Sequence, residues 1–444
     1  MVKDLTEGKP EVVLWKFSIP MFVSVIFQQL YNIADSVIAG KFAGEDALAA
    51  VGASYPITMI FMAVAMGCNI GCSVVISQLF GGKKFNRMKT AVYTTLIAST
   101  AVALFLTVTG LLASRAMMVM IHTPDNIFAD AALYLRIYIG GLIFLFLYNI
   151  ATGIFNSLGD SKTPLYFLIG SSLGNIVLDY IFVAYFHWDV AGVAWATFLA
   201  QGVSCVLSLI TLWRRLSQIK TEGKVALFSG EMLGRICVIA VPSILQQSFI
   251  SVGNMFIQTL VNRCGSSVIA GYSAAIKLNT FAITAFTTLA NGLSSFTAQN
   301  IGAEKFERVK KGMRAGIAMA LCVAVPFFLA YFFFSGTMLQ LFMNEESSMA
   351  METGRNFLQI VSPFYFVVLV KLMADGVLRG SGAMREFMVA TLSDLVLRVI
   401  LAYIFYAPFG AVGIWMSWPI GWAVATALSV FFYLKGRWIV GRSS

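Results

Sequence analysis

Long hydrophobic runs recur along the whole chain, and they constrain its fold more than any other feature. A run needs about twenty apolar residues to cross the roughly 30 Å hydrocarbon core of a bilayer as a helix. Twelve such runs occur, near residues 15–39, 50–79, 90–112, 128–157, 164–186, 190–213, 236–262, 267–298, 312–335, 353–379, 387–407 and 410–434. Because lipid offers the backbone no hydrogen-bonding partner, these runs must form helices. The sequence therefore predicts an all-α polytopic membrane protein with about twelve transmembrane helices.

The composition supports this class and argues against others. The 444 residues are 59% hydrophobic and only 12% charged, which is too little polar surface for a soluble protein. A net charge of +10 is expected from the basic loops of a membrane protein, so we predict no nucleic-acid partner. The six cysteines lie mostly inside apolar runs, and we predict neither disulfides nor a thiolate metal site.

The connections between the runs alternate in charge. Alternate connections and the C-terminal tail carry basic clusters, such as Lys83–Lys89, Arg214–Lys224, Lys305–Lys311 and Lys435–Arg442. The connections on the opposite side, such as "HTPDN" (122–126) and "NEESS" (344–348), are poor in basic residues. Since cytoplasmic loops carry the excess of Lys and Arg, the pattern predicts that both termini are cytoplasmic.

The two halves of the chain resemble each other. "SQLFGGKKFNRMK" (77–89) aligns with "AQNIGAEKFERVK" (298–310), which pairs Gln78 with Gln299. An even number of helices per half gives both halves the same orientation, so this is a parallel repeat about a pseudo-twofold axis along the membrane normal. We predict two six-helix bundles, an N-terminal lobe at 1–218 and a C-terminal lobe at 235–444, joined by a cytoplasmic linker at 219–234.

Ionisable residues inside the runs are functional hypotheses, because each must face a partner or water. The acids and bases of this kind are Asp35, Asp179, Asp375, Asp394, Lys277, Lys371, Arg379 and Arg398. Asp394 and Arg398 are four residues apart and share a helical face, with the acid N-terminal. We predict a structural ion pair for these two.

Asp35 and Asp179 have no basic residue within a turn on their own helices. Both fall in the outer half of the membrane at comparable depth, and Asn175 lies one turn before Asp179. Two carboxylates and neutral oxygens would suit a proton or a hard cation, although each acid could instead be satisfied separately by hydroxyls or amides. The second half lacks these acids, with Ile257 and Ala402 at the corresponding positions.

An ordered set of motifs in both halves resembles the MATE family of multidrug and toxic-compound extruders. These motifs include "YNIADSVIAGKFAGEDALAAVG", "SQLFGGKK" with its repeat, "GDSKTP" (159–164), "AGVAWAT" and "ADGVLRGSG" (374–382). The resemblance covers essentially the whole chain and is closer to the bacterial DinF-like branch. It implies two six-helix bundles facing a central cleft, with alternating access.

The resemblance also implies site residues. The cation-binding and coupling residues of the first lobe would be Asp35, Asn149, Asn175, Asp179 and Thr197. The proline at which helix 1 bends in the family would be Pro20. The NorM-like branch has a glutamate in helix 7, where this chain has only Gln246, Gln247 and Asn254. This difference argues against a NorM-like cation site in the second lobe. Asp375 stays a candidate for binding the charge of a substrate.

The resemblance implies a secondary antiporter that expels lipophilic, mostly cationic organic compounds in exchange for H⁺ or Na⁺. We expect no cofactor besides the coupling ion, no metal beyond possible Na⁺, a monomer in contact with membrane lipid, and a location in the inner (cytoplasmic) membrane. A flippase for a lipid-linked oligosaccharide or peptidoglycan precursor, from the same superfamily, is the alternative. A membrane enzyme is disfavoured because no nucleophile motif or phosphate loop is present.

Overall fold

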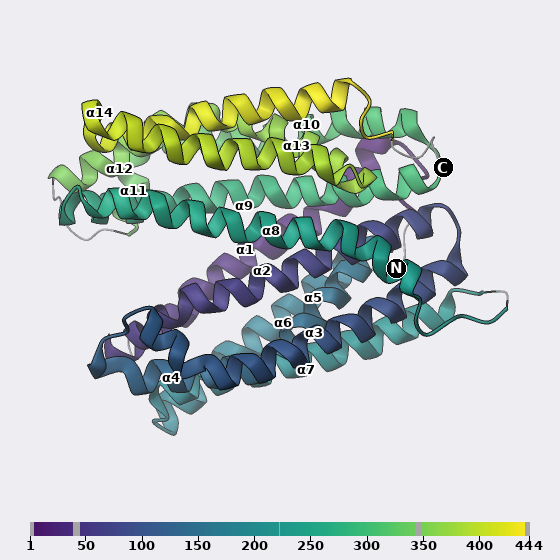
Figure 1. Cartoon of the computed structure of the whole chain (residues 1–444), viewed down its shortest axis with the longest axis horizontal. Coiled ribbons are helices and arrows are strands. Elements are labelled where there is room, and N and C mark those ends of the chain that lie inside the picture. Colours follow the sequence, from purple (N-terminus) through teal and green to yellow (C-terminus); the bar gives the residue numbers. More distant parts are fainter. Residues whose placement is uncertain (1–3, 39–44, 222, 343–347, 440–444) are drawn as a thin grey trace. The chain divides into compact units, whose positions relative to one another are not determined.

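The computed structural model describes residues 4–38, 45–221, 223–342 and 348–439, except for the side chains of 32–38, 45–48 and 348. Within these ranges the regular secondary structure is entirely helical (Figure 1), which confirms the predicted all-α class. The chain divides into two compact units. Unit 1 comprises Met1–Asp4 and Ile19–Ile244, and unit 2 comprises Leu5–Ser18 and Leu245–Ser444.

Unit 1 is a bundle of long helices that follow α1 (Pro10–Ile38). Its elements are α2 (Glu45–Gly81), α3 (Phe85–Met120), α4 (Asp125–Gly140), α5 (Leu142–Ser157), α6 (Lys162–Asp179), η2 (Tyr180–Tyr185) and α7 (Asp189–Gln218). Helix α2 packs against α3, α4 and α5, whereas α7 packs against α4, α5 and α6. The two sets share α4 and α5, which therefore lie at the centre of the unit.

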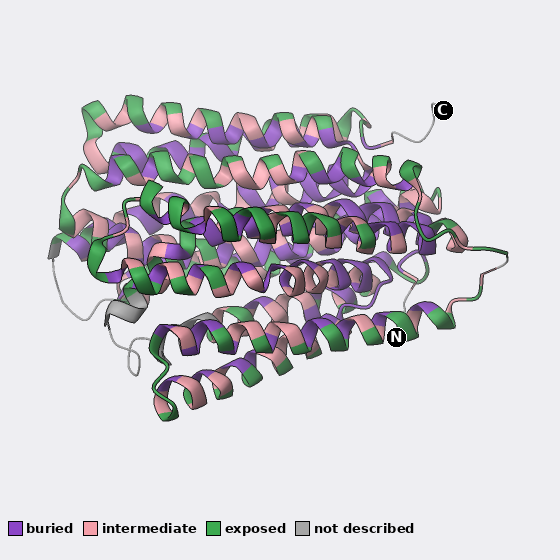
Figure 2. Cartoon of the chain, turned by 60° about the horizontal axis from the view of Figure 1, so that its bottom comes forward, coloured by how far each residue is buried: buried purple, intermediate pink, exposed green. Residues whose placement is uncertain are grey.

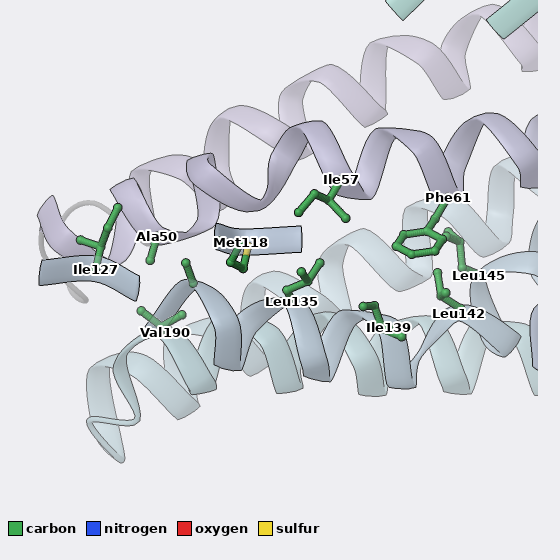
Figure 3. Packing of buried hydrophobic residues seen from close by; sticks show 11 residues of the cluster. Ala50, Ile57, Phe61, Met118, Ile127, Leu135, Ile139, Leu142, Leu145 and Val190 are labelled. Carbon is green, nitrogen blue, oxygen red and sulfur yellow. The ribbon is translucent and has the colours of Figure 1, made fainter. Parts of the chain in front are cut away.

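Apolar side chains fill the space between α2, α3, α4 and α5. Ile57 and Phe61 are four residues apart on α2 and so lie on one face of that helix. They meet Met118 of α3, Ile139 of α4 and Leu142 of α5 in one cluster, and each of these five is at most 5% exposed (Figure 3). These side chains form the apolar core between the inner helices of unit 1.

Unit 2 repeats the pattern. Its elements are α8 (Gly230–Asn262), α9 (Ser266–Gly302), α10 (Phe306–Phe333), α11 (Ser335–Gln340), α12 (Ser348–Val361), η3 (Ser362–Phe364), α13 (Tyr365–Ser381) and α14 (Met384–Leu434). Helix α9 packs against α10, α12 and α13, and α13 also packs against α14. Helices α9 and α13 are therefore the inner helices of this unit.

The outer sides of the helices carry large apolar side chains. Leu112 is 82% exposed, and Phe105 and Trp213 are both more than 60% exposed. Figure 2 shows exposed and buried residues alternating along the helices. Lipid tails are as apolar as leucine, so such faces are stable in a bilayer. The exposed apolar faces and the many candidate spans identify a multi-pass membrane protein.

The number of spans agrees with the twelve that were predicted. Among the described residues, ten helices are long and apolar enough to cross a membrane, and the bent pair α4–α5 adds an eleventh span. Helix α14 is kinked at Gly410 (φ 56°, ψ −137°), a conformation that favours glycine. The kink divides α14 into arms of 26 and 24 residues, each long enough to cross, and this division provides the twelfth span.

Both halves interrupt the same helix at the same place. Helices α4 and α5 meet at Gly141 with a bend of 48°. In the second half the 3₁₀ turn η3, which contains Pro363, separates α12 from α13. Gly141 and Pro363 are 222 residues apart, within one residue of the offset that relates Gln78 to Gln299. The duplication therefore extends to the irregularities of the helices.

Helices α1 and α8 each belong partly to both units. Residues up to Ser18 of α1 pack with unit 2 and the rest with unit 1, whereas α8 passes from unit 1 to unit 2 after Ile244. Pro20 and Pro242 lie within two residues of these crossing points. The two compact units therefore differ from the predicted lobes at 1–218 and 235–444 and their linker at 219–234. The reason is that the first part of α1 and the first part of α8 each pack with the opposite half of the chain.

The segment that precedes α1 is bound to unit 2 by hydrogen bonds. We call residues Leu5–Gly8 the N-terminal strap. Gln299 and Asn300 of α9 bond to the backbone of Leu5 at 2.9 and 3.3 Å, and Lys305 bonds to the carbonyl of Thr6 at 2.9 Å. Arg308 of α10 reaches the carbonyls of Gly8 (2.6 Å), Leu5 (3.3 Å) and Glu7 (3.3 Å). These four residues belong to the repeated motif "AQNIGAEKFERVK" (298–310), which thus binds the N-terminal strap.

In unit 1, α8 approaches α2 at two glycines that are four residues apart. A Cβ atom added at Gly71 would lie 2.6 Å from the Cβ of Ala240, and one at Gly67 would overlap Ile244. Small residues at this spacing allow the backbones of two membrane helices to pack closely. The leading half of α8 therefore sits directly against α2.

We expect Gly71→Ala to destabilise unit 1 by about 1–3 kcal/mol, because the added methyl group forces the two backbones apart. The matched control is Gly170→Ala in α6, where an added Cβ would meet nothing within 4 Å. That change should be neutral or stabilising by about 0.5–1 kcal/mol, since alanine is the better helix former. Thermal unfolding of the purified protein in detergent measures both. Equal shifts for the two variants would contradict the close approach.

Candidate functional site

Among the described side chains of unit 1, the most deeply buried carboxylate is that of the last residue of α6. Asp179 is 0% exposed and Asn175, one turn earlier, is 2% exposed. Tyr31 of α1 donates a hydrogen bond from its hydroxyl to Oδ1 of Asn175, which joins α1 to α6. The Nδ2 atom of Asn175 is buried and has no hydrogen-bond partner among the described residues. An acid and an amide thus lie within a helix that is long and apolar enough to span a membrane, and a phenol from α1 bonds to the amide.

Asp35 falls one helical turn beyond Tyr31 on the same helix. Its side chain lies outside the described residues, so its predicted proximity to Asp179 stays a prediction. The backbone of α1 continues as a helix through this position to Ile38. Tyr31 was not identified from the sequence, although its spacing of four residues from Asp35 predicts that the two lie on the same face of the helix.

The helix changes type immediately after Asp179. Residues Tyr180–Tyr185 form a π-helix, a rare conformation that occurs most often at functional sites. Helix α7 packs closely here, because a Cβ added at Gly192 would lie 3.0 Å from Cγ2 of Val183. The corresponding part of the second half, within the first arm of α14, has ordinary α-helix instead. The backbone that follows Asp179 therefore differs from the corresponding backbone of the second half, which has no acid at that position.

The other two predicted polar ligands of unit 1 lie on neighbouring helices. Thr197 of α7 is half-buried and lines a small cavity, together with Tyr134, Tyr138, Gly141 and Gln201. Asn149 of α5 donates from Nδ2 to the carbonyl of Leu145 in its own helix at 2.8 Å. Neither residue bonds to Asn175 among the described hydrogen bonds.

Pro20 is buried in the interior of α1, two residues past the point where the helix leaves unit 2. A proline in a helix lacks the backbone N–H that would bond to the preceding turn, which weakens the helix there. Ser24 donates from its hydroxyl to the carbonyl of Pro20 at 2.9 Å. Such a local bond also favours bending of a helix.

Unit 2 contains a separate buried ion cluster on α13. Nζ of Lys371 lies 2.8 Å from Oδ2 of Asp375, and the hydroxyl of Ser429 donates to Oδ1 of the same carboxylate at 2.6 Å. Arg379 is one turn further along and donates to Oδ1 of Asn291 at 2.5 Å. The spacing of four residues between Lys371 and Asp375 is typical of an ion pair on one helix face, although this pair was not predicted.

Asp394 and Arg398, predicted as an ion pair, lie with Nη2 of Arg398 3.7 Å from Oδ2 of Asp394. The guanidinium also lies 4.4 Å from the ring centroid of Trp418. Gln246 and Gln247 are half-buried in α8, whereas the cluster around Asp375 is built from α9, α13 and α14. Asp375 therefore has a lysine and a serine as partners, and the roles of Asp375, Gln246 and Gln247 toward a substrate stay predictions.

Comparisons with known proteins agree with this arrangement of helices. The MatE family model matches residues 20–181 and 242–404, once in each half. The probable multidrug resistance protein YpnP of Bacillus subtilis (strain 168) is 27% identical over 442 residues, covering 98% of this chain and 97% of the relative. The multidrug export protein MepA of Staphylococcus aureus (strain bovine RF122 / ET3-1) is 21% identical, with 96% and 94% covered.

A solved structure shares the fold. It is that of a MOP superfamily transporter from Pyrococcus furiosus, described as having a binding pocket of reverse polarity that suggests a different function. It superimposes with a TM-score of 0.91 at 24% sequence identity, and covers 98% of this chain and 97% of that one. The two matches of the family model together include most of the chain, so the protein belongs to the MatE family, as the sequence motifs indicated.

Proposed function

We propose that this protein exports lipophilic, mostly cationic organic compounds in exchange for H⁺ or Na⁺, which binds at Asp179 and Asn175 of unit 1. The observation that carries this proposal is the complete burial of Asp179 inside a candidate membrane span. Acids at such positions mark ion pathways and proton relays in transporters. The names of YpnP and MepA, a multidrug resistance and a multidrug export protein, support export as the direction.

The cation has a clear physical role at this site. A buried carboxylate is costly unless it is neutralised, and a proton or a Na⁺ ion with oxygen ligands neutralises it. Asp179, the amide oxygen of Asn175 and the hydroxyl of Tyr31 provide such oxygens. We assign Asp35 as the second carboxylate of the site, with Asn149 and Thr197 as nearby polar groups that complete it in another conformation. Pro20 then serves as the hinge of α1.

Membrane potential adds a driving force to cation binding. Moving one positive charge inward is worth about 2.3 kcal/mol per 100 mV. A cation that binds one conformation of unit 1 more tightly than another shifts the equilibrium toward that conformation. The size of the shift is set by the difference between the cation's affinities for the two conformations. Alternating access then requires only that the bound cation and the bound organic compound favour different conformations. We place the protein in an inner (cytoplasmic) membrane with both termini in the cytoplasm, because alternate connections and the C-terminal tail carry the basic clusters.

Proteoliposomes test the coupling directly. Purified protein should export a fluorescent lipophilic cation when a pH gradient or a Na⁺ gradient is imposed, and the response to each gradient alone identifies the ion. Asp35→Asn should remove most of the gradient-driven transport, because the site loses one carboxylate. The matched control is Asp130→Asn, an exposed acid on α4, which should transport like the wild type.

Full gradient-driven transport by Asp35→Asn would contradict the assignment of that residue. Absence of any response to both gradients in active wild-type protein would contradict antiport itself. Movement of a lipid-linked oligosaccharide, with no movement of organic cations, would favour the flippase instead.

A further inference from the structure

The carboxylate of Asp375 is fully occupied within unit 2. Lys371 donates to one oxygen at 2.8 Å and Ser429 donates to the other at 2.6 Å. The lysine and the aspartate are about 5% exposed, and the serine is not exposed. The two charged residues come from the same helix at a spacing of four, so the helix itself sets their separation.

The cluster is enclosed by closely packed backbones. A Cβ added at Gly376 would lie 2.7 Å from the carbonyl of Ala290, and one added at Gly380 would overlap the carbonyl of Ser294. Both glycines belong to α13 and both carbonyls to α9, so these two helices are nearly in backbone contact. This packing fixes α13 against α9, and the neighbouring Asp375 is only 4% exposed. The ammonium group of Lys371 fills the position in which a monovalent cation would otherwise neutralise the acid.

We infer that Lys371 is a built-in cation, which occupies the carboxylate of Asp375 in place of an external Na⁺ or H⁺. An ammonium group carries the same charge as these ions but is tethered to the chain, so it neither binds from one side of the membrane nor leaves on the other. Arg379, the other positive charge on this face of α13, bonds to Asn291 and stacks 5.7 Å from Phe387. It is thus held by its own partners, one turn away from the pair.

This inference rests on the proposed antiport and deepens it. If Lys371 neutralises Asp375 permanently, unit 2 contributes no coupling ion, and each cycle depends on the acidic residues of unit 1 alone. Lys371 then determines how many cations move per exported molecule. Removing its charge should convert Asp375 into a cation site, because the neutral hydroxyl of Ser429 does not offset the charge of the buried carboxylate, which then takes up a proton or a metal ion.

The test compares variants by thermal unfolding in detergent, which does not depend on transport. Lys371→Met removes the charge at similar length, and Lys371→Gln removes it but keeps a hydrogen-bond donor for Asp375 if the methionine variant does not fold. In either variant, replacing choline by Na⁺, or lowering the pH from 8 to 6, should raise the melting temperature by about 2 °C or more beyond the wild-type response. The eight tryptophans provide the fluorescence signal.

Two controls isolate the charge. Lys371→Arg keeps a cation beside Asp375, and the double variant Lys371→Met with Asp375→Asn removes both charges; neither should gain the extra response. The inference is overturned if folded Lys371→Met and Lys371→Gln respond to Na⁺ and pH as the wild type does. It is also overturned if wild-type protein shows a Na⁺ response that Asp375→Asn abolishes. Failure of the wild type to transport under either gradient would reject the antiport proposal and would leave these unfolding results unaffected.

Discussion

Asp179→Asn should reduce the export of an electrically neutral compound, driven by an inside-negative membrane potential of 100 mV, by about 50-fold, because the inward-moving cation is then the net charge that crosses. The neutral side chain cannot carry an inward-moving cation, so transport loses the roughly 2.3 kcal/mol that one charge gains from this potential. Asparagine has nearly the same shape and volume as aspartate, so the substitution preserves the packing around α6. We therefore expect the variant to fold and to bind the organic compound, and to fail only in coupling.

Proteoliposomes clamped at defined K⁺ diffusion potentials measure this effect. The ratio of transport at 100 mV to transport at 0 mV should fall to about one in Asp179→Asn and stay high in Asp130→Asn. A variant that keeps its full voltage dependence would remove Asp179 from the coupling site. A variant that no longer binds the organic compound would show that this acid acts on substrate instead.

Arg308→Ala should release the N-terminal strap. Arg308 donates to three carbonyls of the strap and to Oδ1 of Asn300, the last at 2.9 Å. Hydrogen bonds to a charged group each contribute about 1.5–3 kcal/mol, and shared contacts make their sum less than additive. We expect a loss of about 3 kcal/mol of local stability, which corresponds to roughly 100-fold faster amide exchange in Leu5–Gly8.

Hydrogen–deuterium exchange with mass spectrometry measures this release. Lys310→Ala is the matched control, because Lys310 is exposed on the same helix and pairs only with Glu307 at 2.7 Å. It should change stability by less than about 1 kcal/mol, as exposed ion pairs do. Unchanged exchange of the strap in Arg308→Ala would show that Gln299, Asn300 and Lys305 suffice to hold it.

Hydropathy and the repeat predicted the overall class of this fold well. Twelve apolar runs correspond to the spans of the structure, because a helix that crosses lipid must be apolar along its whole length. Breaks within a span were not predicted. The run at 128–157 was expected as one helix, but Gly141 divides it, since a bend does not alter hydrophobicity. In the same way, the runs at 387–407 and 410–434 were expected as two separate helices, and the structure joins them by a kink at the single residue Gly410.

Side-chain partners within one helix were accessible from the sequence, whereas partners between helices were not. A spacing of four residues predicts the proximity of Asp394 to Arg398, and it would have predicted that of Lys371 to Asp375. The contact of Tyr31 with Asn175 depends on how α1 packs against α6, which no local pattern encodes. The π-helix after Asp179 is equally hidden, because its residues are ordinary apolar ones.

The N-terminal strap has a consequence for how the protein is made. Leu5 leaves the ribosome early, but its partner Arg308 lies 303 residues later. At about 5–20 residues per second, the strap waits roughly 15–60 s for the surface that binds it. Unit 2 therefore cannot finish folding from its own stretch of chain alone. Two separately translated halves would each carry a leading segment whose docking surface is on the other polypeptide, so neither half could mature without its counterpart.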